Sequence, residues 1–198
     1  MIYLLRCVAG RNVPLLQQMR SYSSSCCRNS SAALRKEIQD ANERYAGRIA
    51  ICKVNDDVGW GLKVMKDFRR GDVVIQAKAL ETLPKPHSHT VQIDFNRHVM
   101  MDLPARFVNH RCNSANLGVQ DNDLGAFDFI ALRDISQNEE LTWDYEDAEY
   151  DMDTPFECAC GDVNCRKLVR GWKYSNDSGD HVKYLPKYRQ DDLEEKAS

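Results

Sequence analysis

Cysteines in the last quarter of the chain have the spacing of a metal site. Cys158, Cys160 and Cys165 fall within eight residues, a spacing that suits tetrahedral zinc once a fourth ligand is supplied. Cys112 is a natural fourth ligand and would make the site all-thiolate. Disulfide bonds are the competing interpretation. They fit less well, because the leading residues do not read as a secretory signal and three clustered cysteines cannot all pair.

A glycine-tryptophan-glycine motif, Gly59-Trp60-Gly61, follows a turn and opens a predicted strand. Glycines let the backbone come close to a ligand and adopt positive φ angles. The indole of Trp60 offers a flat face to a cationic or planar group. By itself, the motif fits an ordinary turn equally well.

Two further motifs place polar groups close together in the sequence. The segment 106–116 has few apolar residues, and its amide, imidazole and thiol groups belong to Asn109, His110, Cys112 and Asn116. A lone histidine in such a loop is otherwise a structural residue. The third motif, Glu139-Glu140-Leu141-Thr142-Trp143-Asp144-Tyr145, comes shortly before the three clustered cysteines.

Taken in order, these motifs resemble the SET-domain protein lysine methyltransferases that carry a post-SET zinc segment. The resemblance covers about residues 48–174. It implies a mostly β fold of several small sheets with a pseudoknot loop, and transfer of a methyl group from S-adenosyl-L-methionine to the ε-amine of a protein lysine. Such threading of the chain is otherwise rare in proteins.

The resemblance also implies a role for each matching position. The methyl donor S-adenosylmethionine would be held by Gly59, Trp60, Gly61, Asn109, His110 and Tyr145. Tyr145 also stands at the position of the family's catalytic tyrosine. The structural zinc ion would be bound by Cys112, Cys158, Cys160 and Cys165.

Two positions bear on how closely the family pattern is followed. Asn138 stands where a glycine is common, directly before Glu139. Trp143 matches the aromatic position that is associated with the number of methyl groups added, and this favours multiple methylation. An ordinary core aromatic residue is an equally good interpretation of Trp143.

Two other classes of function compete with the enzyme. One is a catalytically weak SET module that acts as a zinc-stapled protein-binding domain. The other is a zinc-stabilised scaffold without a cofactor, in which Gly59-Trp60-Gly61 would only make a turn. The presence of Asn109, His110 and Tyr145 favours the enzyme over both.

The positioning elements are predicted to be short strands. Of the 198 residues, 42% are hydrophobic and 29% charged, which excludes wholesale disorder. Apolar runs separated by turn residues predict β-structure, and strand-then-helix alternation is not evident. A short helix or linker at 32–45 and a turn near 104–108 are expected besides. The predicted strands are 48–54, 61–65, 72–76, 91–95, 98–102, 117–120, 127–132 and 140–145.

The charge divides the chain into two pieces. Residues 1–36 hold six basic and no acidic residues, whereas the remainder holds 21 basic and 30 acidic residues, a net charge of −9. The first piece is rich in arginine and serine and amphipathic as a helix, which is typical of a mitochondrial or, second, a plastid transit peptide. A flexible basic tail that binds nucleic acid or anionic lipid is the alternative, and the protein would then be nuclear or cytoplasmic.

We therefore expect five regions: a transit peptide or disordered basic leader (1–36), a helical linker (37–47), a SET domain (48–150), a post-SET zinc segment (151–175) and a C-terminal tail (176–198), frayed at its end. The expected partner is a basic, lysine-containing protein, attracted by an acidic rim after Tyr145. The folded domain lacks a basic stripe, which argues against direct nucleic-acid binding. The sequence contains no run of 18 apolar residues, so no membrane span is predicted. Segments 171–174 and 184–186 are expected to cover the cofactor as a lid.

Overall fold

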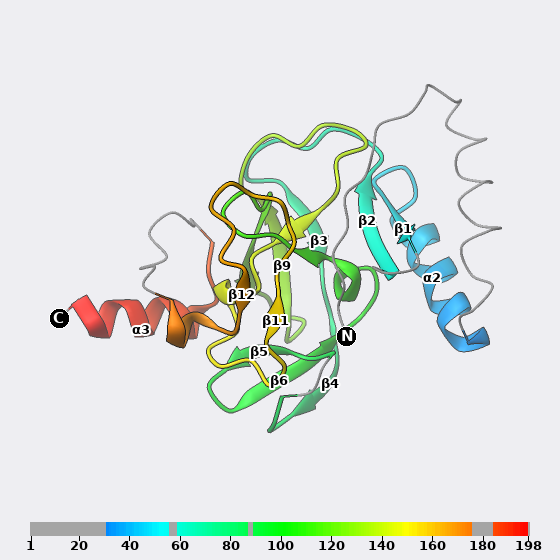
Figure 1. The fold of residues 1–198 in the computed structure, drawn as a ribbon. Helices are drawn as coiled ribbons and strands as arrows, with labels where there is room; N and C mark the ends of the chain where they lie inside the picture. Colours follow the sequence, from blue (N-terminus) through cyan, green and yellow to red (C-terminus); the bar gives the residue numbers. More distant parts are fainter. Residues whose placement is uncertain (1–30, 56–58, 87–88, 176–183, 198) are drawn as a thin grey trace.

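Short strands in small sheets make up most of the fold (Figure 1). The computed structural model describes residues 31–55, 59–86, 89–175 and 184–197. Most of the predicted transit peptide, residues 1–30, lies outside the described residues. The predicted fold class, mostly β with several small sheets, is confirmed. In the described residues, no helix is long and apolar enough to cross a membrane.

The first sheet pairs β1 (Ile49–Asn55) with β2 (Gly59–Val64) in antiparallel order. Cys52 lies opposite Gly61 and is buried, as a strand residue should be. Gly59 begins β2 with a φ of +79°, and a Cβ placed on it would meet no atom within 4 Å. The backbone conformation, rather than crowding, therefore favours glycine at this position.

In the central sheet, the strand of the motif 139–145 lies next to the strand of the segment 106–116. Its order is β3-β9-β8-β10-β7, with the bounds Val73–Gln76, Phe127–Ala131, Leu117–Asp121, Thr142–Trp143 and Asn109–His110. β7 and β8 follow each other in the chain, yet β10 lies between them and runs parallel to both.

Asn116 fixes this insertion with both ends of its amide. Its Nδ2 donates to the carbonyl oxygen of Glu140 at 2.8 Å, and its Oδ1 accepts from the Thr142 amide at 2.9 Å. The crossing of these segments is the pseudoknot arrangement that the resemblance implies.

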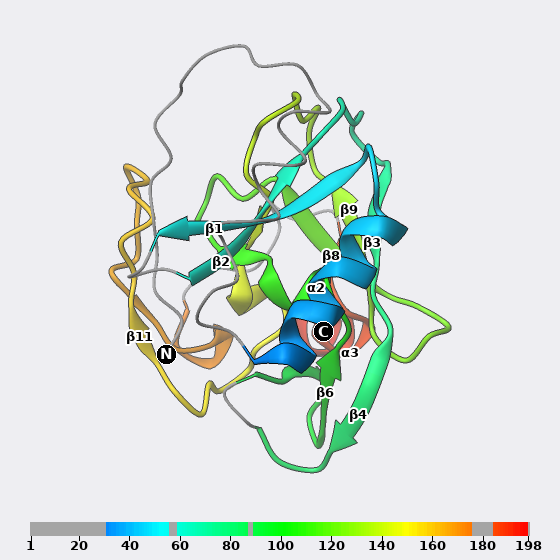
Figure 2. The ribbon, with the colours of Figure 1, turned by 90° about the vertical axis from the view of Figure 1, so that its right-hand side faces the viewer.

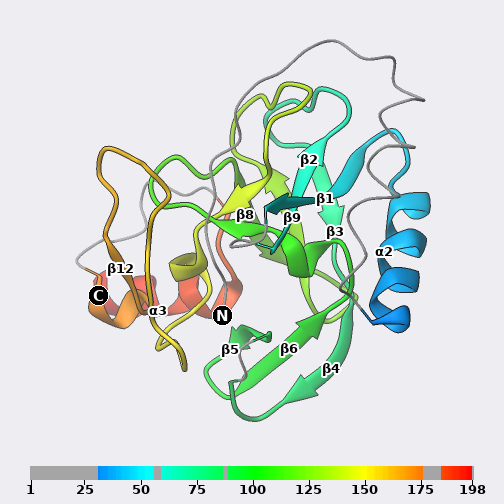
Figure 3. The ribbon, with the colours of Figure 1, turned by 45° about the vertical axis from the view of Figure 1, so that its right-hand side comes forward.

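A three-stranded sheet extends from the lower side of the central sheet in Figures 1 and 3. Its order is β4 (Ala79–Leu83), β6 (Arg97–Met101) and β5 (Val91–Asp94), and the predicted hairpin of β5 and β6 is confirmed. β4 is a strand that the sequence does not predict. Its three central side chains are all exposed, so no alternation marks it: Leu80, Glu81 and Thr82.

The remaining strands bracket the clustered cysteines. β11 (Phe156–Glu157) and β12 (Leu168–Val169) pair in antiparallel order and hold the segment between them as a loop. Single-turn 3-10 helices complete the sheets: η1 (Ala105–Phe107), η2 (Tyr145–Asp147) and η3 (Trp172–Tyr174). η1 is the turn expected near 104–108.

The core lies between the central sheet, the β1–β2 sheet and helix α2 (Ala32–Arg44). α2 begins where the Ser31 hydroxyl accepts from the Leu34 amide at 3.2 Å as an N-cap, and the short helix expected at 32–45 is confirmed. The helix buries Ile38 and Ala41 against the core. The largest fully buried side chains of the core are Leu62, Ile75, Leu117, Phe127, Phe129, Ile135 and Leu141.

The end of the chain is a helix, not the frayed tail that its charges suggest. α3 (Lys187–Ala197) lies on the opposite side of the molecule from α2, as Figures 1 and 2 show from two directions. Leu185, Tyr188 and Arg189 are buried at its first turn. The acidic run from Asp191 to Glu195 hides this anchor in the sequence, because charged residues surround the few that are buried.

Gly171 should not tolerate alanine. Its φ is +113°, and an added Cβ would overlap the carbonyl of Tyr150, so both the backbone and the packing oppose a side chain. We expect Gly171→Ala to lower the free energy of unfolding by about 2–5 kcal/mol. The matched control is Gly47→Ala, where φ is +73° but the space is open, and about 1–2 kcal/mol is expected. Equal losses in urea unfolding would contradict the steric argument.

Candidate functional site

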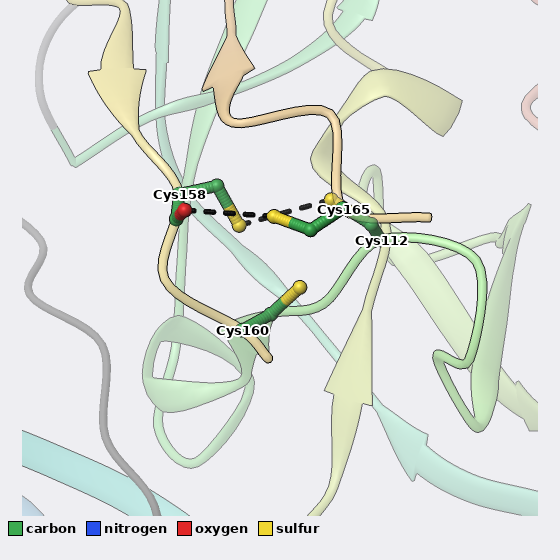
Figure 4. Close-up of side chains that lie close together, drawn as sticks. All are labelled: Cys112, Cys158, Cys160 and Cys165. Carbon is green, nitrogen blue, oxygen red and sulfur yellow. Dashed lines mark hydrogen bonds between the residues drawn. The ribbon is translucent and has the colours of Figure 1, made fainter. Parts of the chain in front are cut away.

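The four predicted zinc ligands meet in one cluster. Their Sγ atoms all lie within 4.8 Å of one another, and Figure 4 shows them converging from the loop after β7 and from the β11–β12 loop. The sulfurs of Cys112 and Cys158 are 3.7 Å apart. Tetrahedral zinc with Zn–S bonds of about 2.3 Å needs sulfurs about 3.8 Å apart, whereas a disulfide needs about 2.0 Å. The geometry therefore fits the metal interpretation, and the disulfide alternative fails.

The cluster is also buried, which makes a cation necessary for its thiolates. Burial raises the pKa of Cys112 to about 11 and that of Cys158 still further. Four neighbouring thiolates would repel one another in such surroundings. A divalent cation that binds all four sulfurs removes this penalty, as in structural zinc sites.

His110 connects the cysteine cluster to the backbone of Tyr145. Its Nδ1 accepts from the Tyr145 amide at 3.2 Å, so the ring proton is assigned to Nε2, which lies 3.3 Å from the Cys112 sulfur. Burial lowers the pKa of His110 to about 3, and the ring is neutral. The histidine therefore acts as a fixed spacer between a metal ligand and the tyrosine.

Tyr145 sits at the start of η2 with its hydroxyl in a defined position. Of the strand expected over residues 140–145, Thr142–Trp143 is a strand and Glu140 forms an isolated bridge with Lys63. The strand ends there because the Asp144 carboxylate accepts from the Glu146 amide and turns the chain into η2. The Tyr145 hydroxyl donates to the Val108 carbonyl at 3.1 Å. Burial, helped by the charges of Glu149 and Glu140, raises the pKa of Tyr145, so the hydroxyl stays protonated and donates.

Arg166 binds the two residues on either side of Tyr145. Its guanidinium pairs with Asp144 through Nη2 and with Glu146 through Nη1, the latter at 3.1 Å. Both carboxylates are buried. Because Arg166 directly follows Cys165, this ion pair joins the cysteine segment to the tyrosine turn.

Only part of the acidic rim expected after Tyr145 is exposed to solvent. Glu146, Asp147 and Glu149 are buried, because the chain turns inward at η2, and they do not face solvent. The remaining acidic residues of the predicted rim are exposed or half-exposed: Asp151, Asp153 and Glu157.

The residues predicted to hold S-adenosylmethionine lie side by side. The Asn109 amide donates to the Trp60 carbonyl at 3.3 Å and to Glu140 at 3.1 Å. Trp60 stacks on Phe107 with ring centroids 5.7 Å apart. The structure thus joins the β2 motif to the β7 motif, and the cofactor role of these residues stays a prediction. A cavity of about 560 Å³ behind the loop 111–116 does not include them.

The surroundings of Trp143 fit both interpretations of this residue, as a core aromatic and as an aromatic neighbour of the catalytic tyrosine position. It is 2% exposed and packs edge-on against Phe129, as a core aromatic does. Its ring also lies 5.2 Å from that of Tyr145. Asn138 has a φ of +73°, which explains why glycine is common there and why asparagine is tolerated.

The first predicted lid segment, 171–174, packs on an aromatic cluster through Trp172. Trp172 contacts Tyr150, Phe95 and Tyr188, with ring centroids 5.1–6.4 Å apart. The cover of both lid segments over a cofactor stays a prediction.

Sequence reasoning missed several residues that hold the site together. Phe156 lies 5.6 Å from the His110 ring and 6.0 Å from the Tyr145 ring, and its position two residues before the first clustered cysteine was the available signal. Arg166 had a similar signal, because it directly follows the last cysteine. Nothing in the spacing pointed to Glu149 as a buried residue.

Comparisons with known proteins agree with this geometry. The family model "SET domain" matches residues 59–146. The chain is 26% identical to "Histone-lysine N-methyltransferase SUVR4" of Arabidopsis thaliana, covering 57% of this chain and 31% of SUVR4. It is 27% identical to "Probable inactive histone-lysine N-methyltransferase SUVR1" of the same plant, covering 58% of this chain and 20% of SUVR1.

A solved structure shares the fold. The crystal structure of KRYPTONITE in complex with mCHG DNA and SAH superposes with a TM-score of 0.51 at 24% identity, over 62% of this chain and 29% of that one. The chain thus spans less than a third of the length of SUVR4, SUVR1 or this chain of KRYPTONITE. Residues 59–146 of the protein are thus similar to a SET domain.

Replacing Arg166 should destabilise the site strongly. Arg166→Gln leaves two buried carboxylates without their cation, and we expect a loss of about 3–5 kcal/mol in the free energy of unfolding. Arg133→Gln breaks the exposed ion pair with Glu139 and should cost less than about 1 kcal/mol. Urea unfolding measures both, with elemental analysis to verify equal zinc content. Similar losses for the two variants would contradict the role assigned to Arg166.

Proposed function

We propose that the protein transfers a methyl group from S-adenosylmethionine to the ε-amine of a lysine in a protein substrate. The observation that carries this proposal is the position of Tyr145. Its protonated hydroxyl is fixed on the Val108 carbonyl, between Trp143 and the His110 ring, in a SET domain. The relatives named histone-lysine N-methyltransferases support the same reaction.

The residues that would hold the methyl donor belong to the Gly59-Trp60-Gly61 motif of β2 and to Asn109 and His110 of β7. S-adenosylmethionine supplies a methyl group on a sulfonium sulfur. A Cβ placed on Gly59 would meet open space, and the neighbouring indole of Trp60 is half-buried, which suits a planar or cationic group. The half-buried Asn109 donates to the Trp60 carbonyl and to Glu140 and so stays beside the β2 motif. These features fit a nucleoside-bearing cation.

The chain contributes mainly orientation to the reaction. A neutral lysine amine must attack in line, and fixing the two reactants can lower the barrier by roughly 7–11 kcal/mol in good cases. Tyr145 donates a hydrogen bond, and the Val108 carbonyl offers a weak C–H···O acceptor to a methyl group. Aromatic side chains around Tyr145, those of Trp143 and Phe156, exclude water and lower the pKa of a bound lysine from about 10.4.

Zinc would be structural in this enzyme. Cys112, Cys158, Cys160 and Cys165 provide all four ligands, so no coordination position is left for water or substrate. The metal would hold the β11–β12 loop against the loop after β7.

The substrate that we propose is a basic protein, with histones as the first candidates because of the names of the relatives. The net charge of −9 beyond residue 36 supports a basic partner. The prediction that the folded domain does not bind nucleic acid stays untested, and DNA accompanies KRYPTONITE in its complex.

A catalytically weak, protein-binding SET module is the second candidate. The similarity to SUVR1, which is named as probably inactive, favours it. Retention of Tyr145 with its hydrogen bond to Val108 favours the enzyme.

We further propose that residues 1–36 direct the protein to mitochondria. The support is their composition: six basic residues, no acidic residue and many serines.

The Tyr145→Phe variant tests the catalytic role. We expect the full-chain protein to label lysines in histones or in mitochondrial or nuclear extracts, and the variant to fall by roughly 10²-fold while still binding S-adenosylmethionine. Tyr45→Phe, at a buried tyrosine outside the candidate site whose hydroxyl donates to the Gln76 carbonyl, is the matched control and should keep full activity. Label in none of these substrates would favour the binding module, and unchanged turnover of Tyr145→Phe would exclude the proposed role of the hydroxyl.

Replacing three arginines tests the leader. We expect the full chain with a C-terminal fluorescent tag to enter mitochondria, and the variant with Arg6→Gln, Arg11→Gln and Arg20→Gln to remain outside, because import signals depend on positive charge. Microscopy and cell fractionation give the result. An identical distribution of both proteins would contradict the proposal.

A further inference from the structure

Gln92 is a buried glutamine in β5, and both ends of its side-chain amide are hydrogen-bonded. It is 3% exposed, although glutamine is mostly a surface residue. Its Oε1 accepts from the Tyr150 amide at 2.8 Å, and its Nε2 donates to the Asp94 carbonyl at 3.2 Å. The flipped amide would set an NH2 group against the Tyr150 N–H, so the orientation is assigned by this network.

The backbone of Gln92 makes a further contact with the same partner segment. Its amide donates to the Glu149 carboxylate at 3.0 Å. Gln92 therefore donates to one residue of the segment and accepts from the next. Phe95, directly after β5, adds an edge-on contact with Tyr150 at 5.5 Å between ring centroids. Together these contacts join the three-stranded sheet to the chain that leaves η2.

The segment that Gln92 binds is the continuation of the turn at Tyr145. The Tyr145 carbonyl accepts from the Ala148 amide at 3.2 Å and from the Glu149 amide at 2.9 Å. The Tyr150 amide is the next along the chain, and it donates to Gln92 instead of continuing the turn. Without this acceptor a part-buried amide would lose its partner, which is unfavourable, and the turn could shift to satisfy it.

All three polar groups of Tyr145 have a fixed partner. Its amide donates to the His110 ring at 3.2 Å, and its hydroxyl donates to the Val108 carbonyl at 3.1 Å. Its carbonyl is bound by the segment that Gln92 holds. The charge of Glu149 is among the causes that raise the pKa of Tyr145, so the two side chains are close enough to interact.

We propose that Gln92 is a positioning residue for Tyr145. By fixing the end of the turn, it fixes the carbonyl side of the tyrosine and, with it, the direction of the ring and the hydroxyl. This inference rests on the proposed function, because it concerns the hydroxyl that acts in methyl transfer. In-line transfer depends on orientation, and a displacement of about 1 Å can lower a rate by roughly 10²-fold. The contact comes from β5, whereas those of His110 and Arg166 come from the side of the cysteines.

Gln92→Met is the first test, because methionine keeps the length of the side chain but removes the amide. On the protein substrate that the wild type labels best, we expect kcat to fall at least about tenfold. The KM for that substrate and the Kd for S-adenosylmethionine should stay within about twofold, because a misplaced hydroxyl affects the transition state and not the binding of the reactants. A raised KM with an unchanged kcat would overturn the inference.

Asn122→Leu is the matched control for a lost side-chain acceptor. The half-buried Asn122 accepts from the Leu124 and Ala126 amides in the turn after β8, away from Tyr145. We expect this variant to keep kcat within about twofold even where its Tm falls as much as that of Gln92→Met. An equal fall of kcat in both variants would mean a general loss of structure and would contradict the positioning role.

A double variant tests whether Gln92 acts through the hydroxyl of Tyr145. In the Tyr145→Phe background the hydroxyl is already absent, so adding Gln92→Met should lower kcat by less than about twofold. Independent defects would multiply. A further loss of about tenfold in the double variant would therefore overturn the inference.

Hydrogen exchange of the wild-type protein tests the contact without any substitution. The Tyr150 amide should exchange with D2O about as slowly as the Glu149 amide, because Gln92 accepts from it. NMR spectroscopy of the full chain measures both amides. Exchange of the Tyr150 amide at the rate of an open loop would overturn the inference, even if Gln92→Met did not fold.

The exchange and rate measurements separate this inference from the proposed function. A slowly exchanging Tyr150 amide without any methylation by the wild type would contradict the proposed function and, with it, a role of Gln92 in the reaction. Methylation by the wild type with an unchanged kcat in Gln92→Met would contradict only the role of Gln92.

Discussion

The ion pairs of Arg166 with Asp144 and Glu146 are the interaction on which the site depends. They join two chain segments whose positions are set by different forces, the cysteine loop by its thiolates and the tyrosine turn by the pseudoknot. Both carboxylates are buried and accept hydrogen bonds from backbone amides, but the guanidinium is the cation that compensates their charge. Arg166 makes it favourable for an acidic turn to point inward, and this turn places Tyr145 in the core.

Burial gives each titratable group around Tyr145 a single protonation state or a defined partner. His110 is neutral and acts as a spacer, because burial holds its pKa at about 3. Tyr145 stays protonated and donates to Val108. Glu149 differs from both, since burial brings its pKa to about 7 without fixing its state.

The strands that the sequence predicts are those that bury several apolar side chains. β1, β2, β8 and β9 have buried faces and were found within a few residues, whereas β4 has none and was missed. The zinc ligands were predictable because cysteine has few other uses at that spacing. The buried acids were not, because an acidic run such as Glu146–Glu149 looks solvated until Arg166, far along the chain, is placed against it.

The metal cluster reaches Tyr145 by two routes. One runs from Cys112 through the His110 ring to the Tyr145 amide, and the other from Cys165 through Arg166 to the flanking acids. Because the routes hold the tyrosine from different sides, loosening either alone leaves the other contact in place. Loss of the metal releases both together. A structural zinc ion without a reacting ligand position can therefore still determine where the hydroxyl of Tyr145 lies.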